Sequence, residues 1–455
     1  MPYTEVNPYN GKTIREFPNT TNSQLNEFLN QATIFYQKAQ VQPVKEREIL
    51  LERLADEFEN HMEKYAQILT VNMGKLIGEA RSEVKKNITF AHYYAENGSQ
   101  LLKPQSSEIL PNGNAQIEFS GTGIVLAIEP WNFPYTQVMR VFAPNFILGN
   151  PVVLKHASIV PGAAQAFQNA CDNAGLPKGA FSNVFINYDQ VNSIIADSRV
   201  QGIALTGSEN AGKRIAATAG SYLKKTTLEL GGTDIFAVLD DADIDRAATD
   251  AATARLSNAG QVCTSAKRYL VSDDIYDQFL LALKKKFSTY QVGDPLDEKT
   301  TLAPLSSKKA KVSLLEQVRM AISGGASLLY GDLESNETQG NEFSPLILTG
   351  MTPNNPMYDE ELFGPVAQIY RVKSDNEIVT KANRSRHGLG GAIYTSDIER
   401  GKRLASRIAT GQVAINHILS SQAGVPFGGI KDSGYGRELG HWGIYEFANI
   451  KAIIY

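Results

Sequence analysis

The sequence predicts an α/β fold in which helices cover a largely parallel sheet. Strand-like apolar runs alternate with helix-like segments over two long stretches, on either side of the Gly231–Gly232 pair. Such alternation is typical of parallel sheets, because parallel strands need a crossover connection that is usually a helix. The chain has 455 residues, of which 42% are hydrophobic. It can therefore form two large domains or about three of roughly 150 residues.

The order of the predicted elements follows from the spacing of apolar residues. Residues 22–103 should be mostly helical, because apolar residues recur three and four positions apart. Strands are expected at 123–129, 151–155, 183–187, 202–207 and 225–230, with helices at 133–149, 160–175 and 210–223 between them. A second alternating stretch has strand-like runs at 234–239, 367–372, 391–395 and 412–416. Asn112-Gly113 predicts a β-hairpin turn.

The composition argues against several classes of protein. Lys and Arg number 44 against 48 Asp and Glu, a formal net charge of −4, which is unlike the basic surface of a nucleic-acid binder. No run of 18 apolar residues predicts a membrane helix. Two cysteines cannot build a disulfide framework, so we expect a reducing, cytoplasmic location.

Two glycine-rich motifs resemble nucleotide-binding patterns but do not match them. "GSENAGKR" (207–214) has the spacing of a P-loop, yet Arg214 stands where Ser or Thr would hold magnesium. "GTG" (121–123) begins like a dinucleotide fingerprint, but Leu126 replaces the third glycine and the motif precedes its strand. Gly207 and Ser208 still open a helix after a strand. Their backbone N–H groups can hold a phosphate there.

Cys263 lies in a polar stretch, "NAGQVCTSAKRYLV" (258–271). Many free cysteines are buried core residues, and Cys171, among alanines in a helical pattern, fits that description. Cys263 differs because its neighbours are small or polar, and Lys267 and Arg268 follow closely. Nearby cations favour the thiolate, which is the nucleophilic form. We therefore interpret Cys263 as a candidate nucleophile, with a structural thiol as the alternative.

A nucleophile needs a base and a group that stabilises developing charge. Glu229 ends a strand-like run before two glycines, and burial there would raise its pKa toward the range of a general base. A surface glutamate in a salt bridge is the alternative. Asn132 lies in a turn after a strand, where its amide could donate to an oxyanion, or where it could simply form the turn.

Taken together, these residues resemble the NAD(P)-dependent aldehyde dehydrogenases, and within that family the bacterial enzymes that oxidise succinate semialdehyde. The motifs follow the family's order along nearly the whole chain. They are "PWNFP" (130–134), "VVLKHAS" (152–158), "LTGS" (205–208), "LELGG" (228–232), "GQVC" (260–263), "EELFGP" (360–365) and "PFGGIKDSGYGRELG" (426–440).

The resemblance implies a role for each catalytic candidate. Cys263 would attack the aldehyde to form a thiohemiacetal, while Asn132 and the Cys263 N–H hold the oxyanion. After hydride transfer to the nicotinamide, Glu229 would activate the water that hydrolyses the thioester. Arg140 and Ser421 match the residues that bind the distal carboxylate of succinate semialdehyde, although an alternative for Arg140 is a salt bridge. Ser257 stands where some relatives have a second arginine. No metal is required.

The resemblance also implies the cofactor site. The implied cofactor-binding residues are Trp131, Lys155, Ser158, Gly207, Ser208, Leu230, Glu361 and Phe363. NAD-preferring relatives often have a glutamate three positions after the motif lysine, whereas this chain has Ser158 there. A carboxylate would repel the 2′-phosphate of NADP⁺. We therefore expect NADP⁺ to be preferred, with NAD⁺ as the weaker alternative.

The family's architecture implies three parts. A Rossmann-type cofactor domain would contain residues 1–106 and 120–230, and an α/β catalytic domain residues 231–442. A small β arm, residues 107–119 and 443–455, would join subunits into a homodimer or homotetramer. Alternatives that stay open are another short or medium-chain substrate such as glutarate semialdehyde, a CoA-acylating enzyme, and a non-catalytic relative. Glu229 argues against CoA acylation, and the presence of all three catalytic candidates argues against the last.

Overall fold

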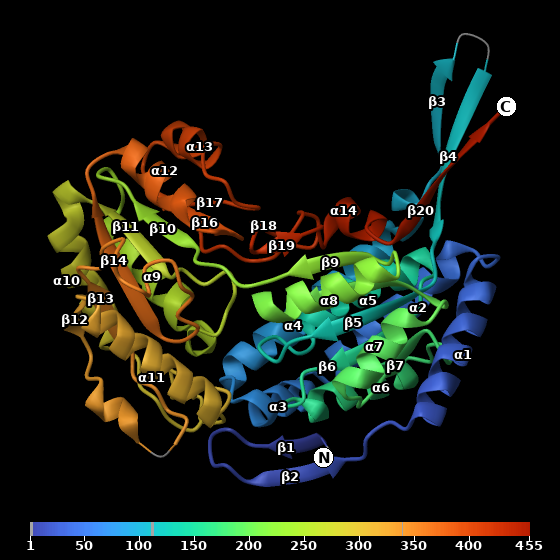
Figure 1. The fold of residues 1–455 in the computed structure, drawn as a ribbon, viewed down its shortest axis with the longest axis horizontal. Helices are drawn as coiled ribbons and strands as arrows, with labels where there is room; N and C mark the ends of the chain where they lie inside the picture. The colour runs from blue at the N-terminus through green and yellow to red at the C-terminus, as the bar shows by residue number, and fades with distance from the viewer. Residues whose placement is uncertain (1–2, 111–112, 339) are drawn as a thin grey trace.

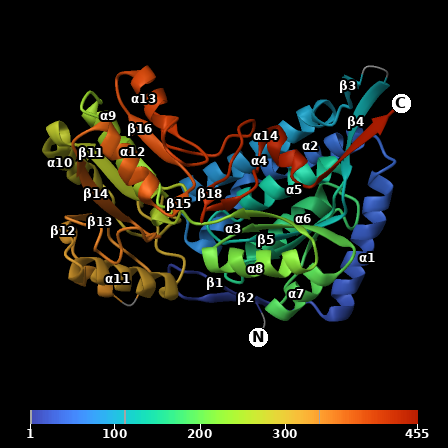
Figure 2. The ribbon, with the colours of Figure 1, turned by 45° about the horizontal axis from the view of Figure 1, so that its top comes forward.

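The computed structural model describes residues 3–110, 113–338 and 340–455. Two lobes, each built on its own sheet, lie side by side, and a β arm projects from one of them (Figure 1). A second view shows the same two lobes with the arm at the edge of the molecule (Figure 2). The predicted α/β class with parallel sheets is confirmed.

The first lobe contains a six-stranded sheet in the order β19-β9-β8-β5-β6-β7. Its strands are β5 (Ile124–Glu129), β6 (Val152–His156), β7 (Phe181–Asn183), β8 (Val200–Thr206), β9 (Lys225–Glu229) and β19 (Gly434–Tyr435). All neighbours pair in parallel except β19, which is antiparallel to β9. The carboxyl ends of five strands therefore meet at one edge.

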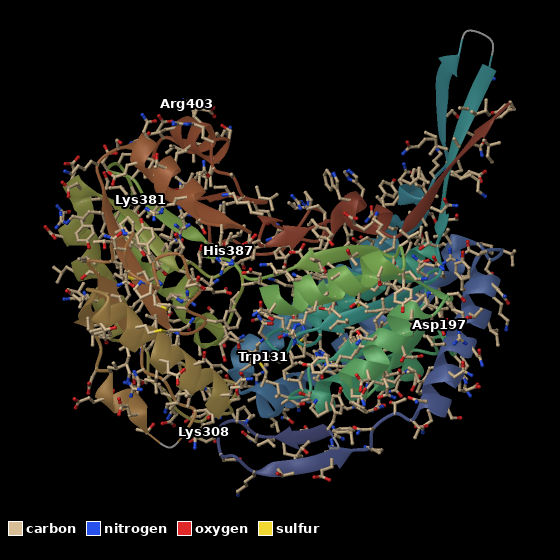
Figure 3. All side chains as sticks on the ribbon, viewed as in Figure 1. Trp131, Asp197, Lys308, Lys381, His387 and Arg403 are labelled. Atoms are coloured by element: carbon tan, nitrogen blue, oxygen red, sulfur yellow. The ribbon has the colours of Figure 1, made fainter. Side chains whose placement is uncertain are left out.

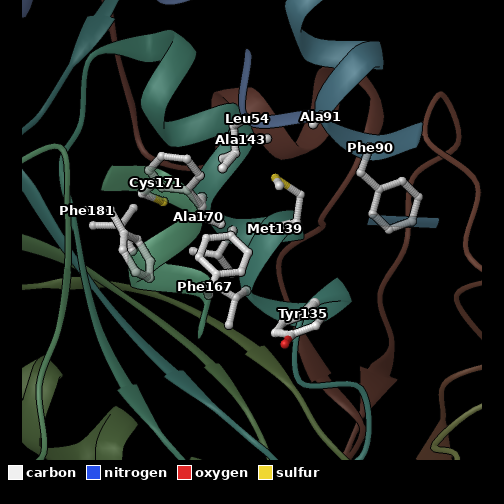
Figure 4. Close-up of a cluster of buried hydrophobic side chains, with 14 of the residues drawn as sticks. Leu54, Phe90, Ala91, Tyr135, Met139, Ala143, Phe167, Ala170, Cys171 and Phe181 are labelled. Atoms are coloured by element: carbon white, nitrogen blue, oxygen red, sulfur yellow. The ribbon is translucent and has the colours of Figure 1, made fainter. Parts of the chain in front are cut away.

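The helices around this sheet are α1 (Asn22–Ala39), α2 (Val44–Asn60), α3 (Met62–Met73), α4 (Ile77–Leu101), α5 (Thr136–Leu148), α6 (Pro161–Asn173), α7 (Tyr188–Ala196) and α8 (Glu209–Ser221). Of these, α1, α5, α6, α7 and α8 pack directly on its strands, whereas α2, α3 and α4 pack mainly on one another and on α5 and α6. Cys171 on α6 is buried in the same apolar cluster as Phe167, Phe181 and Met139 (Figure 4). Its prediction as a core residue is confirmed.

The second lobe contains a seven-stranded sheet in the order β12-β13-β14-β11-β10-β16-β17. Its strands are β10 (Ile235–Val238), β11 (Arg268–Ser272), β12 (Ser327–Tyr330), β13 (Leu346–Thr349), β14 (Val366–Val372), β16 (Gly391–Tyr394) and β17 (Ala414–Ile415). Its helices are α9 (Ile244–Leu256), α10 (Tyr276–Phe287), α11 (Lys308–Ser323), α12 (Asp375–Arg384) and α13 (Ile398–Ala405), with 3₁₀ turns at Ser257–Gly260, Asp273–Ile275 and Glu334–Glu337.

The arm is an antiparallel sheet in the order β20-β4-β3. It consists of β3 (Gln105–Leu110), β4 (Gly113–Gly121) and β20 (Ala448–Ile454), so the chain's C-terminal strand covers one edge of β4. The predicted turn at Asn112-Gly113 falls partly outside the described residues, because Asn112 is not among them. The remaining elements are β1 (Tyr3–Val6), β2 (Thr13–Phe17), β15 (His387–Gly388), β18 (Ile430–Lys431) and α14 (Gly440–Tyr445).

Two strands differ from the elements predicted from the sequence. The strand expected at 183–187 lies instead at β7, which ends at Asn183, although the Val184 N–H still donates to the Leu154 carbonyl of β6. Phe185 there exchanges hydrogen bonds with Thr20 in the segment that precedes α1. In addition, β19 comes from the range expected for the catalytic domain but pairs with β9 of the first sheet. The exact domain boundaries stay a prediction.

Candidate active site

The site lies where the carboxyl ends of the first sheet face the second lobe. β5, β8 and β9 end at Glu129, Thr206 and Glu229, and Thr206 pairs in register with Glu229. Ligands of open parallel sheets bind in the crevice beyond these ends. Trp131, two residues after β5, lies near the centre of the molecule between the lobes (Figure 3). The motifs predicted from the sequence are thus brought to one place.

The loop that carries Cys263 begins with three consecutive left-handed residues. Asn258 and Ala259 each have φ of 52° and Gly260 has φ of 72°. A Cβ on Gly260 would lie 2.3 Å from the carbonyl oxygen of Gly364, so only glycine fits. Residues 258–261 are buried. The tight, buried backbone therefore accounts for the glycine at position 260.

Buried polar groups hold this loop in its strained conformation. Arg255 donates from Nη2 to the carbonyl of Gly260 and from Nη1 to that of Ala266. The Glu79 carboxylate accepts the Asn258 N–H at 2.8 Å. Left-handed non-glycine residues cost of order 1–3 kcal/mol each and persist only where surrounding contacts enforce them. These contacts therefore determine where Cys263 stands.

Burial dominates the ionisation of Cys263. It raises the pKa of the thiol to about 11, although the positive charges of Arg140 and Lys267 oppose the shift. Lys267 does not contact the sulfur, because its ammonium donates to carbonyl oxygens of the same loop and pairs with Glu361 at 3.0 Å. Arg268 donates to carbonyls elsewhere. The charge of Lys267 thus favours the thiolate as expected, but burial outweighs it, and Arg268 is not among the groups that shift this pKa.

Asn132 is oriented by four hydrogen bonds. Its Nδ2 donates to the carbonyl of Gln261 at 3.0 Å, and its Oδ1 accepts from Gln137 Nε2 at 3.1 Å. Its own carbonyl accepts from Lys75 Nζ at 3.0 Å and from Asn258 Nδ2 at 3.1 Å. An amide nitrogen has two N–H groups. One therefore stays available for a ligand next to the cysteine loop.

A buried ion pair also holds the segment that contains Asn132. Lys75 and Glu83 pair with each other, and both side chains are almost completely buried. The Glu83 carboxylate also accepts the backbone N–H of Tyr135 at 2.9 Å and of Thr136 at 3.3 Å. Lys75 and Glu83 therefore hold the segment between β5 and α5 at both ends. A buried charge that lost its partner would cost several kcal/mol.

Glu229 is buried, with only 3% of its surface exposed, and neither carboxylate oxygen has a hydrogen-bond partner in the described part of the protein. Burial raises its pKa well above the ordinary carboxyl range, and the neighbouring Glu438 and Glu129 raise it further. Arg140 and Arg437 act in the opposite direction. The raised pKa expected for a carboxylate at the end of a buried strand is confirmed.

Cys263 borders two cavities. One, of about 240 Å³, is also lined by Arg140 and Ser421, the predicted substrate residues. It is smaller than the roughly 300–1,000 Å³ of sites for drug-sized ligands, so it suits a short molecule. The other, of about 300 Å³, is also lined by Glu229 and Asn132. The cysteine thus stands where a small substrate pocket meets a second ligand site.

The second cavity collects most of the predicted cofactor residues. Its lining includes Trp131, Gly207, Ser208, Leu230, Glu361 and Phe363. The rings of Trp131 and Phe363 meet edge-to-face at 5.9 Å. A Cβ on Gly231 would lie 2.3 Å from a carboxylate oxygen of Glu361, so the glycine lets that side chain lie against the turn after β9.

A groove of about 620 Å³ lies beside α8 and shares Ser208 with this cavity. Lys155 and Arg214 line the groove, and its lining contains no Asp or Glu. Ser208 is the N-cap of α8, whose helix dipole and free N–H groups favour an anion. Ser158 is exposed beyond the end of β6 and is not part of the lining.

Comparison with known proteins identifies the arrangement. The model of the aldehyde dehydrogenase family matches residues 2–453. The chain belongs to this family. A succinate-semialdehyde dehydrogenase [NADP(+)] of Deinococcus radiodurans is 44% identical over 99% of this chain and 94% of its own. The Escherichia coli succinate semialdehyde dehydrogenase [NAD(P)+] Sad is 37% identical over 98% and 96%.

Solved structures of aldehyde dehydrogenases confirm the fold. The succinic semialdehyde dehydrogenase of Streptococcus pyogenes, solved with NADP+, superimposes with a TM-score of 0.97, with 46% identity over 99% of both chains. The predicted fold, with a Rossmann-type sheet, a second α/β lobe and a β arm, is that of the aldehyde dehydrogenase family.

Several residues of this aldehyde dehydrogenase site were not predicted from the sequence. Lys86 lines the small pocket, Glu438 pairs with Arg140, and Gln137 orients Asn132. Glu438 lies inside the motif at 426–440, which could have marked it as a site residue. The sequence around Lys86 contains no motif that indicates a role in the site. Within the described ranges, no three His, Cys, Asp or Glu side chains are grouped to hold a metal ion. Nor is any helix there long and apolar enough to span a membrane.

The raised pKa of Cys263 predicts how the thiol reacts with iodoacetamide. Because only the thiolate reacts, the alkylation rate should rise about tenfold per pH unit between pH 7 and 9, well below a pKa of about 11. Mass spectrometry follows modification of Cys263, and buried Cys171 serves as the internal control. A rate that is already constant above pH 7 would show a preformed thiolate and contradict this electrostatic account.

Proposed function

We propose that this protein oxidises succinate semialdehyde to succinate, with NADP⁺ preferred and NAD⁺ as the weaker alternative. The observation that carries the proposal is the position of Cys263, which lines both the small pocket and the larger cofactor cavity. The relatives whose names specify succinate semialdehyde and NADP+ support the same conclusion. Glutarate semialdehyde or another short or medium-chain aldehyde is the second candidate substrate.

Addition of Cys263 to the aldehyde forms a carbon–sulfur bond and places negative charge on the carbonyl oxygen. The free N–H of Asn132 and the backbone N–H of Cys263 are the donors for that oxygen. Because burial keeps the thiol protonated, its proton must leave as the bond forms. Glu229, with a raised pKa and a place in the same cavity, is the base that can accept it.

Oxidation leaves a thioester on Cys263, and water must then release the acid. Glu229 can take a proton from that water, because its oxygens face no other hydrogen-bond donor among the described residues. Hydrolysis breaks the carbon–sulfur bond and returns the sulfur as a thiol. The presence of this base favours transfer to water over transfer to CoA, whereas a CoA-acylating enzyme would need no such base.

A nicotinamide dinucleotide, when bound, accepts the two electrons and the hydrogen that the substrate loses. The residues present fit it. Ser208 and the N-terminus of α8 suit a pyrophosphate, Lys155 and Arg214 line the adjacent groove, and Glu361 and Phe363 line the nicotinamide side. The absence of acidic groups from the groove lining supports a 2′-phosphorylated cofactor.

The substrate assignment rests on the side chains that line the small pocket. Arg140 and Ser421 line it together with Cys263. An arginine N–H and a serine hydroxyl can both donate to a carboxylate. An aldehyde that also has a carboxylate therefore fits the chemistry of the pocket, with Cys263 for the aldehyde and these donors for the carboxylate. The succinate-length molecule suits the small volume better than a longer one.

We also infer a cytoplasmic homodimer or homotetramer. Ile450, Ile453, Ile454 and Tyr455 are exposed on or next to β20, an edge strand of the arm. Exposed apolar side chains on a free strand edge favour pairing with another chain. A reactive thiol such as Cys263 is best preserved in a reducing compartment.

The proposed activity is tested with a panel of aldehydes and both cofactors, with and without CoA. Wild type should reduce NADP⁺ fastest with succinate semialdehyde and should not need CoA. Cys263→Ala should lose activity with every aldehyde because the nucleophile is gone, while Cys171→Ala, in the core of α6, should keep it. Substantial turnover by Cys263→Ala, or absence of wild-type activity with all aldehydes, would refute the proposal.

The cofactor preference is tested by Ser158→Glu. A carboxylate there should repel the 2′-phosphate and lower kcat/KM for NADP⁺ by at least about tenfold relative to that for NAD⁺. Ser82→Glu places the same charge on an exposed position of α4 and should change neither value. A wild-type enzyme that prefers NAD⁺, or equal effects of Ser158→Glu on both cofactors, would show that this interpretation is wrong.

A further inference from the structure

The small pocket next to Cys263 contains two cationic side chains. Arg140 comes from α5 and Lys86 from α4, two helices that pack against each other. No Asp or Glu side chain lines the pocket. The family resemblance implied a substrate role for Arg140 and none for Lys86, but the surroundings of the two cations differ.

The positive charge of Arg140 already has a counterion. Its Nε lies 2.7 Å from a carboxylate oxygen of Glu438, and both side chains are buried. Its guanidinium also lies over the ring of Phe427, 4.5 Å from the ring centroid. Glu229 and Glu129 act on the same guanidinium. Arg140 Nη2 has no hydrogen-bond partner among the described residues, so it can donate to a substrate, but nearby carboxylates offset its charge.

Lys86 has no such counterion. Within residues 3–110, 113–338 and 340–455, no ion pair or hydrogen bond of its ammonium is found. The one carboxylate that acts on it is Glu83, one turn earlier on α4, and Glu83 is already paired with Lys75. Burial lowers the pKa of Lys86, and the like charges of Arg140 and Lys75 lower it further. An anion in the pocket would relieve this unfavourable environment.

We propose that Lys86 is a substrate-binding residue that supplies the unbalanced positive charge for the distal carboxylate of the aldehyde. Arg140 Nη2 and the hydroxyls of Ser420 and Ser421, which line the same pocket, then add directional hydrogen bonds. A lysine suits this task, because its compact charge sits on a flexible stem and adjusts to the carboxylate. The proposal rests on the proposed function and names a specificity residue for it.

The test compares Lys86→Met, which keeps the length of the side chain but removes its charge, with Lys86→Arg, which keeps the charge. For succinate semialdehyde, kcat/KM of Lys86→Met should fall about 10- to 100-fold, mainly through a higher KM. For butanal, the uncharged aldehyde of equal length, it should stay within about threefold. Lys86→Arg, which keeps the charge, should retain most of the wild-type kcat/KM for succinate semialdehyde. Lys85→Met, at the neighbouring exposed lysine of α4, is the matched control and should resemble wild type.

A measurement without turnover separates binding from catalysis. Succinate should slow the alkylation of Cys263 by iodoacetamide in wild type and in Lys85→Met, because it fills the pocket beside the sulfur. In Lys86→Met this protection should need at least about tenfold more succinate. Equal protection in Lys86→Met and wild type would overturn the proposal, and so would equal effects of the substitution on both aldehydes. A wild type that does not prefer succinate semialdehyde over butanal would instead refute the proposed function.

Discussion

Two reciprocal hydrogen bonds join the loop after β5 to the loop that carries Cys263, and the rest of the site depends on them. Asn132 Nδ2 donates to the carbonyl of Gln261, and Asn258 Nδ2 donates to the carbonyl of Asn132. These groups belong to different lobes and are buried at their junction. An unpaired buried polar group costs about 1–3 kcal/mol, so both loops are held in one relative position. The oxyanion donor and the nucleophile are therefore placed together.

The same burial that fixes the geometry also determines the proton chemistry. Burial raises the pKa of Cys263 and of Glu229, so the ligand-free site favours a neutral thiol and holds a carboxyl group that can change its protonation state. A thiol that stays protonated is protected from premature reaction. A carboxylate whose pKa lies above the ordinary range is a better acceptor for the proton of a thiol or a water. The catalytic pair is thus controlled by desolvation more than by neighbouring cations.

Much of this could be predicted from the sequence, because the fold and the motifs are local signals. Alternating strands and helices predict the parallel sheets. Glu229 lies at the carboxyl end of one predicted strand and Asn132 shortly after another, and the carboxyl ends of parallel strands lie at the same edge of a sheet. What could not be predicted depends on segments far apart in the chain. Lys86 borders the pocket only because α4 packs against α5. The burial that raises the pKa of Cys263 against the charge of Lys267 is likewise a property of the folded site and not of the local sequence.

The most direct test of the account is a rapid-mixing experiment on Glu229→Gln with succinate semialdehyde and NADP⁺. If Glu229 accepts the thiol proton during addition and then activates the hydrolytic water, the variant should form the thioester on Cys263 more slowly than wild type, as followed by mass spectrometry. It should then hydrolyse that thioester at least about 100-fold more slowly than wild type. A variant that hydrolyses the thioester at the wild-type rate would contradict the assignment of Glu229 as the base.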